Sequence, residues 1–462
     1  MPNDTYRAWL YRAITALGVV LALLLVTIVP QKMQEPDDWA YYYAAENFSH
    51  GRLVVDSALH DLQVSQAYKD GGELNQYVLV GDDRWAFAEA PGYVFYLLPF
   101  YLVHASELGN FLLAAGLVVM TFLLLKRLKN EKTACLGSLL LLFTPVSLAM
   151  LQREYTGSFA SMAFLGVGGG LYIYYCLRSR EFGPLLAGVV LFLAGLGLGW
   201  GVASSYGNIW VALVFVLHFL ITRIRLWLKG ERRAMVFEVL FLGLGAAIPL
   251  AGLLVYQKVV FGSPWSYGYQ YSQLPIGFAL GYLRQNLNRV PAALLAGFPL
   301  LLVALPALGI MLYQKMAPLA AFLRSRRVAD VWPELRWDIL LLLAGWMVGV
   351  YALYFTYEWT ASTQITSMPF IMAARYYLPA TFPLAILSVL LLMRLPLKLA
   401  ASVIVLAFMW GATLFAQSAL AQPVVPPHNP DVPVTMDMRQ DNQAYLLVSS
   451  AQNTGVTEQC NS

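Results

Sequence analysis

Apolar runs of about 20 residues, separated by short polar segments, recur along almost the whole chain. A run of this length spans the hydrocarbon core of a bilayer as one α-helix. We expect eleven such helices, at residues 10–30, 107–126, 133–151, 155–177, 184–203, 206–224, 234–257, 292–313, 338–357, 377–393 and 399–419. The pattern predicts an all-α polytopic membrane protein.

Composition supports this fold class. Hydrophobic residues make up 59% of the 462 residues, charged residues make up 12%, and the mean hydropathy is +0.60. These values lie outside the range of soluble domains. Three cysteines are too few for a disulfide framework. Nothing in the composition indicates a nucleic-acid partner, and we expect the bilayer itself to be the surrounding solvent.

The charges in the loops indicate which side of the membrane each loop faces. If the N-terminus is cytoplasmic, the cytoplasmic segments hold 20 of the 30 Lys and Arg residues, all of them in short loops. The opposite side then holds 18 of the 26 acidic residues. The positive-inside rule favours this orientation, with the N-terminus in the cytoplasm and the C-terminus on the outer face of the cell membrane.

The first outer loop, residues 31–106, is too long to be a simple connection. Turn clusters at "DGGELN" and "GDD" divide it into short pieces that we interpret as helices. Its apolar end carries Pro91 and Pro99, so we expect an interfacial helix there and not a full span. The chain then divides into a membrane domain, residues 1–421, and an extended outer tail, residues 422–462.

The stretch "EPDDWAYYYAAENFSHG" opens this loop. Pro36 suits the first turn of a helix and Gly51 suits its end, so we expect a helix over 36–50. Tyr41, Ala45 and Phe48 fall on one face of it, which would lay the helix along the membrane surface.

Three carboxylates stand at the start of that helix: Glu35, Asp37 and Asp38. Acidic side chains at a helix N-terminus offset the positive end of its dipole, so they can serve simply as a cap. The alternative is catalytic, because a carboxylate held in this way can act as a general base toward a lipid-borne substrate.

Other patterns have two readings. Aromatic residues occupy every second position of "SPWSYGYQYS": Trp265, Tyr267, Tyr269 and Tyr271. They can form an aromatic belt at the membrane surface, or they can contact a sugar or a prenyl chain. Arg375 opens a span, as an interfacial anchor or as a phosphate ligand. Glycine pairs four residues apart, at 166 and 170 and at 195 and 199, predict close helix packing.

Taken together, these stretches resemble the GT-C superfamily of polytopic glycosyltransferases, which includes protein O-mannosyltransferases and aminoarabinose transferases. In its first outer loop the family often has Asp-Glu, then Tyr, Ala, Asn and His-Gly. Here Asp37-Asp38, Tyr41, Ala45, Asn47 and His50-Gly51 stand at those offsets. "DDRWAFAEAPGYVFYLLPFYLV", "VFGSPWSYGY" and "ARYYLPATFPLAIL" are similar to three further family stretches, in the same order.

The resemblance implies an inverting glycosyltransferase that moves a sugar from a polyprenyl-phosphate donor to a lipid, glycan or protein acceptor on the outer face. It implies that Asp37 is the base, with Asp38 beside it in the catalytic pair. The candidate donor-phosphate ligands are Arg375, Arg153 and Lys258, and the candidate substrate contacts are Glu35, Tyr41, Tyr267, Tyr269 and Tyr376. A divalent metal, Mg²⁺ or Mn²⁺, is compatible with Asp37, Asp38 and Glu35 as oxygen ligands, but the sequence does not require one.

Two other functions remain open. The stretch "EWTASTQITSMPFIMAA" lacks the glycine-rich pattern usual in the family before the arginine, which favours a catalytically silent scaffold subunit of a membrane complex. A lipid or polysaccharide transporter is the third reading. It is less favoured, because ion-coupled transporters carry ionisable groups in mid-span and these spans have few.

Overall fold

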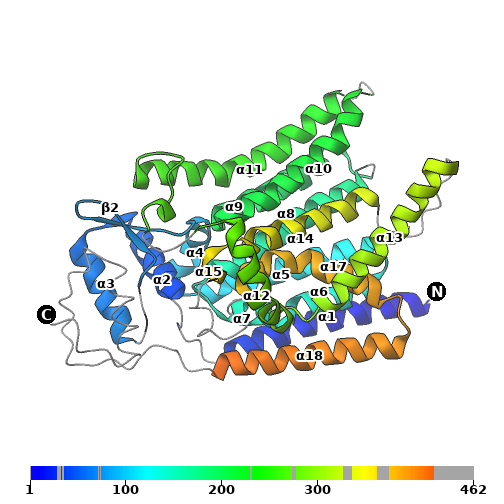
Figure 1. Cartoon of the computed structure of the whole chain (residues 1–462), viewed down its shortest axis with the longest axis horizontal. Coiled ribbons are helices and arrows are strands. Elements are labelled where there is room, and N and C mark those ends of the chain that lie inside the picture. The colour runs from blue at the N-terminus through cyan, green and yellow to red at the C-terminus, as the bar shows by residue number, and fades with distance from the viewer. Residues whose placement is uncertain are drawn as a thin grey trace.

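The fold is described from a computed structural model of the chain, for residues 2–28, 33, 36–70, 72, 74–179, 181–228, 232–272, 277–325, 336–361 and 374–420. Glu35 and the predicted tail, residues 422–462, lie outside these ranges. Long helices run roughly along the length of the molecule, and a small mixed module of helices and strands lies at one end of them (Figure 1). We refer to this as the module end of the bundle.

The bundle contains the helices α1 (Pro2–Ile28), α5 (Ser106–Leu128), α6 (Glu131–Leu142), α7 (Pro145–Gln152), α8 (Gly157–Arg178), α9 (Pro184–Ser204), α10 (Ile209–Leu228), α11 (Arg232–Phe261), α12 (Leu283–Gly297), α13 (Leu301–Ser325), α14 (Trp337–Phe355), α17 (Thr381–Leu392) and α18 (Leu397–Leu420). Shorter turns and helices lie between them: η1 (Tyr206–Asn208), η2 (Gly268–Gln270), η3 (Leu280–Tyr282), α15 (Glu358–Ala361) and η5 (Ala374–Ala380).

Each of the eleven predicted spans falls on helix, but the number of spans is not confirmed. Among the described residues, eight helical segments are long and apolar enough to cross a membrane. Two more spans are formed only if bent pairs count, α6 with α7 at 59° and α12 with α13 at 96°. The bends lie at Pro145 and Pro299, because a proline disfavours helical backbone in the residue before it. The apolar stretch of α18, Lys398–Trp410, is shorter than these eight segments and is not one of them.

The module contains α2 (Pro36–Ser49), α3 (Ser57–Lys69) and a three-stranded antiparallel sheet in the order β1 (Val54–Val55), β3 (Arg84–Phe87), β2 (Tyr77–Gly81). We expected only short helices here, so the sheet corrects that prediction. The "GDD" turn joins β2 to β3 as a hairpin. Its flanks are rich in aromatic and β-branched residues, which favour strands.

Helix α2 is confirmed, but it is packed on nearly every side and does not present one open face to a membrane surface. Gly51 ends the helix with a φ of +72°, and its N–H donates to the Phe48 carbonyl at 2.9 Å. Buried residues lie on every side of α2, among them Trp39, Tyr43 and Asn47. On one side Asn47 of α2 is hydrogen-bonded to Gln63 of α3 and to Tyr77 of β2, and Tyr41 packs on Phe87 of β3. On another side α2 packs against α4 (Gly92–Leu102).

Helix α4 joins the module to the bundle. With 11 residues it is too short to span a bilayer, as expected from its prolines. A Cβ on Gly92 would lie 2.4 Å from the Ala203 carbonyl carbon, so only glycine allows α4 to start against the end of α9. Trp200 Nε1 also donates to the Gly92 carbonyl at 3.0 Å.

Glycines bring the central helices into backbone contact, as their spacing predicted. On α9, a Cβ at Gly195 would lie 2.1 Å from the Leu242 carbonyl oxygen of α11, and one at Gly199 would lie 2.6 Å from the Ala246 carbonyl oxygen. Gly166 and Gly170 of α8 admit side chains of α5 and α17 in the same way.

Far from the module end, Glu238 of α11 accepts a hydrogen bond from Tyr175 at 2.7 Å and pairs with Arg223 at 2.5 Å.

Replacing Gly195 with alanine should destabilise the protein by about 1–3 kcal/mol, because the added methyl group overpacks the contact between α9 and α11. Thermal unfolding of the detergent-purified protein measures this effect. Gly243→Ala is the matched control, since a Cβ there meets nothing within 4 Å. Equal melting of the two variants would contradict the close packing.

Candidate functional site

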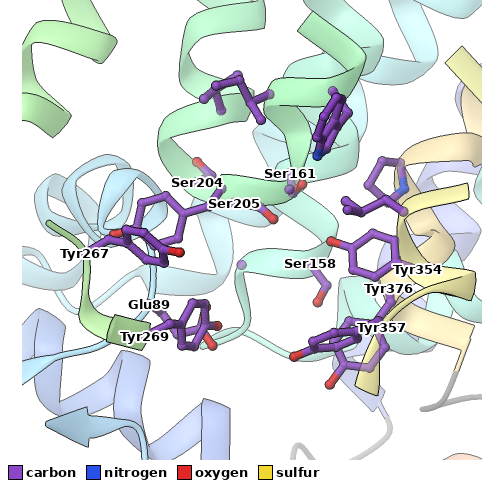
Figure 2. Close-up of a pocket in the computed structure, with 18 of the residues that line it drawn as sticks. Glu89, Ser158, Ser161, Ser204, Ser205, Tyr267, Tyr269, Tyr354, Tyr357 and Tyr376 are labelled. Carbon is purple, nitrogen blue, oxygen red and sulfur yellow. The ribbon is translucent and has the colours of Figure 1, made fainter. Parts of the chain in front are cut away.

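A cavity of about 1190 Å³ opens at the module end of the bundle, where α2, α8, α9, α14 and η5 converge. It has two connected parts. The first is a polar chamber, part of which Figure 2 shows. The second is an apolar groove between three membrane helices, lined by Ile209, Trp210, Leu213, Val214, Leu217, Leu250, Leu253, Leu254, Gly349, Ala352 and Leu353.

The apolar groove follows α10 into the bundle. From Ile209 to Leu217 it descends eight residues, which is about 12 Å at 1.5 Å per residue. Trp210 and Leu213, on the same wall, are 54% and 43% exposed at the surface of the bundle. The groove therefore presents open apolar surface between membrane helices.

Asp37 lies in the chamber, on the first turn of α2. Its Oδ2 accepts a hydrogen bond from Arg375 Nη2 at 2.9 Å, and its Oδ1 accepts one from Gln76 Nε2 at 3.2 Å. The ion pair is largely sheltered, with the Arg375 and Asp37 side chains 5% and 19% exposed. The first turn of α2 and the short helix η5 therefore meet at a charged contact inside the cavity.

Asp38 faces the other way. Successive helical residues are about 100° apart, so Asp38 does not line the cavity with Asp37. Both its carboxylate oxygens accept from the Arg153 guanidinium, in a buried ion pair that ties α2 to the end of α7. The structure thus brings neither Asp38 nor Arg153, both predicted site residues, to the cavity.

Lys258, the third predicted phosphate ligand, is exposed on α11 and does not line the cavity either. Its neighbour Gln257 lines the cavity instead. The other predicted contacts, Tyr41, Tyr267, Tyr269 and Tyr376, all line it. Glu35 lies outside the described residues.

Glu89 is a cavity carboxylate that sequence reasoning missed. It follows β3 and is half-buried in the chamber wall. Burial, and next the nearby Asp37 carboxylate, raise the pKa of Glu89 to about 7, against a hydrogen bond from Tyr269 and the charge of Arg375. A signal was present, because Glu89 is the one acid inside the otherwise apolar stretch "WAFAEAPGYVF".

The aromatic segment after α11 forms one wall of the chamber. Trp265, Tyr267 and Tyr269 line the cavity, whereas the Tyr271 ring stacks on Phe261 at 5.4 Å. A Cβ on Gly268 would lie 2.3 Å from the Ala88 Cα, so this glycine lets η2 press against the chain beside Glu89. Figure 2 shows Tyr269 next to Glu89 as a result.

Hydroxyl groups from several helices surround the chamber (Figure 2). They come from the start of α8, the end of α9, the end of α14 and η5, and they include Ser158, Ser161, Ser204, Ser205, Tyr354, Tyr357 and Tyr376. Hydroxyls donate and accept hydrogen bonds, and aromatic rings offer flat apolar faces. Such a wall suits a polyhydroxylated ligand.

Arg375 is the single cation among the described residues that line the cavity. Its guanidinium lies 4.9 Å from the centre of the Tyr376 ring. Thr156, Gly157 and Ser158 at the start of α8 line the same cavity, and Thr156 makes no side-chain cap. An arginine together with an uncapped helix N-terminus favours a bound anion.

The described residues do not build the metal site that the carboxylates suggested. Among them, no three His, Cys, Asp or Glu side chains lie close enough together to hold a metal ion. Because Asp38 is turned toward Arg153, the described residues give the chamber two carboxylates, Asp37 and Glu89.

The raised pKa of Glu89 makes a stability prediction. The folded state favours the neutral Glu89 carboxyl. The contribution of Glu89 to the free energy of unfolding is therefore complete below its ordinary pKa of 4.5 and is lost as the pH rises through about 7. The melting temperature of the wild type should fall more between pH 5 and pH 8 than that of Glu89→Gln, which keeps a neutral side chain. Parallel melting profiles would refute the shift.

Asp38→Ala should destabilise the protein by about 3–5 kcal/mol, because it removes one partner of a buried ion pair. Asp61→Ala, at a half-exposed side chain of α3, is the control and should melt close to the wild type. If Asp38→Ala kept the wild-type melting temperature, the buried ion pair would not be the stabilising contact described here.

No family model matches the sequence, and no curated protein matches it. Three solved structures share the fold. Cupriavidus metallidurans ArnT bound to undecaprenyl phosphate has a TM-score of 0.52 at 14% identity, covering 86% of this chain and 62% of its own. Archaeoglobus fulgidus oligosaccharyltransferase AglB, with an inhibitory peptide and dolichol phosphate, has a TM-score of 0.58 at 12% identity, covering 90% and 57%.

The apo form of the Archaeoglobus fulgidus oligosaccharyltransferase has a TM-score of 0.54 at 12% identity, covering 95% of this chain and 59% of its own. The chain therefore spans about three fifths of the length of the structures it matches. The likeness lies in the arrangement of the backbone, since the identities are low. The chain has the GT-C transmembrane fold that these transferases share, as the resemblance in its sequence implied.

Proposed function

We propose that this protein is an inverting glycosyltransferase that takes a sugar from a polyprenyl-phosphate donor. One observation carries the proposal: a single cavity joins a chamber holding Asp37, Glu89 and Arg375 to an apolar groove between membrane helices. A lipid-linked sugar has the same division into an apolar tail, a charged phosphate and a polar head. ArnT and AglB, which share the fold, hold undecaprenyl phosphate and dolichol phosphate.

In this arrangement the prenyl chain lies in the groove along α10. The phosphate lies against Arg375 and the start of α8, where positive charge is concentrated. The sugar then occupies the chamber among the serine and tyrosine hydroxyls, within reach of Asp37. These positions place the bond between sugar and phosphate at the junction of the two parts of the cavity.

The reaction is one displacement at the anomeric carbon. A hydroxyl or amine of the acceptor attacks this carbon, and its proton passes to an oxygen of Asp37. The bond from the carbon to the phosphate oxygen breaks, and its electron pair leaves with the polyprenyl phosphate. Arg375 stabilises the negative charge that develops on the departing phosphate.

Orientation follows from the charged loops. With the N-terminus in the cytoplasm, as the excess of Lys and Arg indicates, the module end and its cavity face the outer side of the membrane. The acceptor is then a lipid, a glycan or a protein presented on that side, and the protein acts alone or within a larger membrane complex.

A silent scaffold subunit is the second candidate, favoured by the unusual stretch before Arg375. A scaffold does not need a cavity, and this one is open and retains both Asp37 and Arg375. Transport is the third, and it needs a continuous path. Among the described residues, the lining reaches no further along α10 than Leu217.

Asp37→Asn should reduce sugar transfer about 10²- to 10⁴-fold, which is roughly 3–5 kcal/mol of transition-state stabilisation. The assay measures release of undecaprenyl phosphate from synthetic undecaprenyl-phosphate mannose and undecaprenyl-phosphate aminoarabinose, in membranes that contain the protein. Lys258→Gln is the control and should retain activity, because Lys258 does not line the cavity. Full activity of Asp37→Asn would refute the assignment of the base, and no turnover by the wild type would favour the scaffold.

A further inference from the structure

Both oxygens of the Asp37 carboxylate accept hydrogen bonds in the cavity. Arg375 donates to Oδ2 and Gln76 donates to Oδ1. A general base must offer an oxygen to the proton it removes. In this arrangement each oxygen of Asp37 already accepts a hydrogen bond, so an acceptor group must share an oxygen with Arg375 or Gln76.

The same arginine is needed elsewhere when a donor arrives. A polyprenyl-phosphate sugar carries a negative phosphodiester, and Arg375 is the single cation among the described residues lining the cavity. The phosphate and Asp37, two anions, are therefore drawn to the same positive charge. Because the pair is sheltered from water, this competition is screened less than it would be at a surface.

The surroundings of Arg375 allow an exchange of partners. Its guanidinium lies over the Tyr376 ring, and Nη2 is also 3.3 Å from the Tyr376 hydroxyl. A cation over an aromatic face keeps a favourable contact while it moves across the ring. Tyr376 thus supports Arg375 whether its anionic partner is a carboxylate or a phosphate.

We propose that the ion pair between Arg375 and Asp37 is a latch, which the donor phosphate opens by drawing Arg375 away and so releases Asp37 to act as the base. The inference rests on the proposed function. It makes the reaction ordered, since the base becomes effective only after the donor has bound. An enzyme of this kind would not activate an acceptor in an empty site.

The test is a double-mutant cycle on binding of undecaprenyl phosphate to the full-length protein in nanodiscs, with the four forms wild type, Asp37→Asn, Arg375→Gln and the double variant. Asp37→Asn removes the competing carboxylate and should tighten binding about tenfold, and Arg375→Gln should weaken it by at least about tenfold, both within the range of coupled neighbouring sites. In the Arg375→Gln background, Asp37→Asn should have no further effect.

Glu89→Gln is the matched control, because it removes the other cavity carboxylate without removing the Asp37–Arg375 contact. It should change binding less than Asp37→Asn does. If Asp37→Asn tightens binding equally with and without Arg375, plain charge repulsion accounts for the effect and the latch is refuted. Unchanged binding by Asp37→Asn refutes it as well.

Failure of the proposed function gives a different result. If the wild type does not bind undecaprenyl phosphate, or Arg375→Gln binds it as tightly as the wild type, the phosphate site itself is wrong. Melting curves identify any variant that has lost its fold. Arg375→Lys then replaces Arg375→Gln: it keeps the charge but loses the planar guanidinium, and the latch predicts a smaller effect of Asp37→Asn in that background than in the wild type.

Discussion

The ion pair between Asp37 and Arg375 is the contact on which the site depends, because it joins segments 338 residues apart. Asp37 belongs to the first turn of α2, and Arg375 to the short helix η5 that precedes the last buried span. Each is held by its own surroundings: Asp38 fixes α2 to Arg153, and the Tyr376 ring lies beneath Arg375. Two distant segments of the chain therefore meet at one sheltered charge pair inside the cavity. The other described residues that line it are neutral, apart from Glu89.

The hydrophobic pattern was sufficient to predict the membrane helices, because a span needs a long apolar run and these runs are visible one at a time. Contacts between neighbouring helices were also predictable where glycine spacing produces them, as between α9 and α11. The number of spans was less predictable, because proline breaks at Pro145 and Pro299 bend two of them, by an angle that tertiary packing sets. The small sheet was missed because its strands are two to five residues long, which is too short for an alternating pattern to stand out in an apolar chain.

Of the site residues predicted from the sequence, Asp37, Arg375 and four tyrosines line the cavity, whereas Asp38, predicted beside Asp37 in the catalytic pair, does not. Adjacent acids look equivalent in a sequence, whereas on a helix they point about 100° apart, so one faces the chamber and the other a buried arginine. Arg153 and Lys258 were candidates because they are cations that the sequence places on the outer side of the membrane. Which side of a helix faces a cavity depends on neighbours far away in the chain. Glu89 was missed for the same reason. Its raised pKa results from burial and from the Asp37 carboxylate, and its hydrogen bond comes from Tyr269.

The two parts of the cavity also explain why so few charged residues are needed. For the lipid-linked donor that we propose, burial of apolar surface in the groove requires no particular side-chain chemistry. The proposed reaction uses one cation for the phosphate and one carboxylate for the proton, and Arg375 and Asp37 form an ion pair in the chamber. A buried charge without a partner is costly, so a cavity that holds both an acid and an arginine is most stable when they pair. The proposed exchange of partners on binding rests on the same electrostatic constraint that makes these two groups pair.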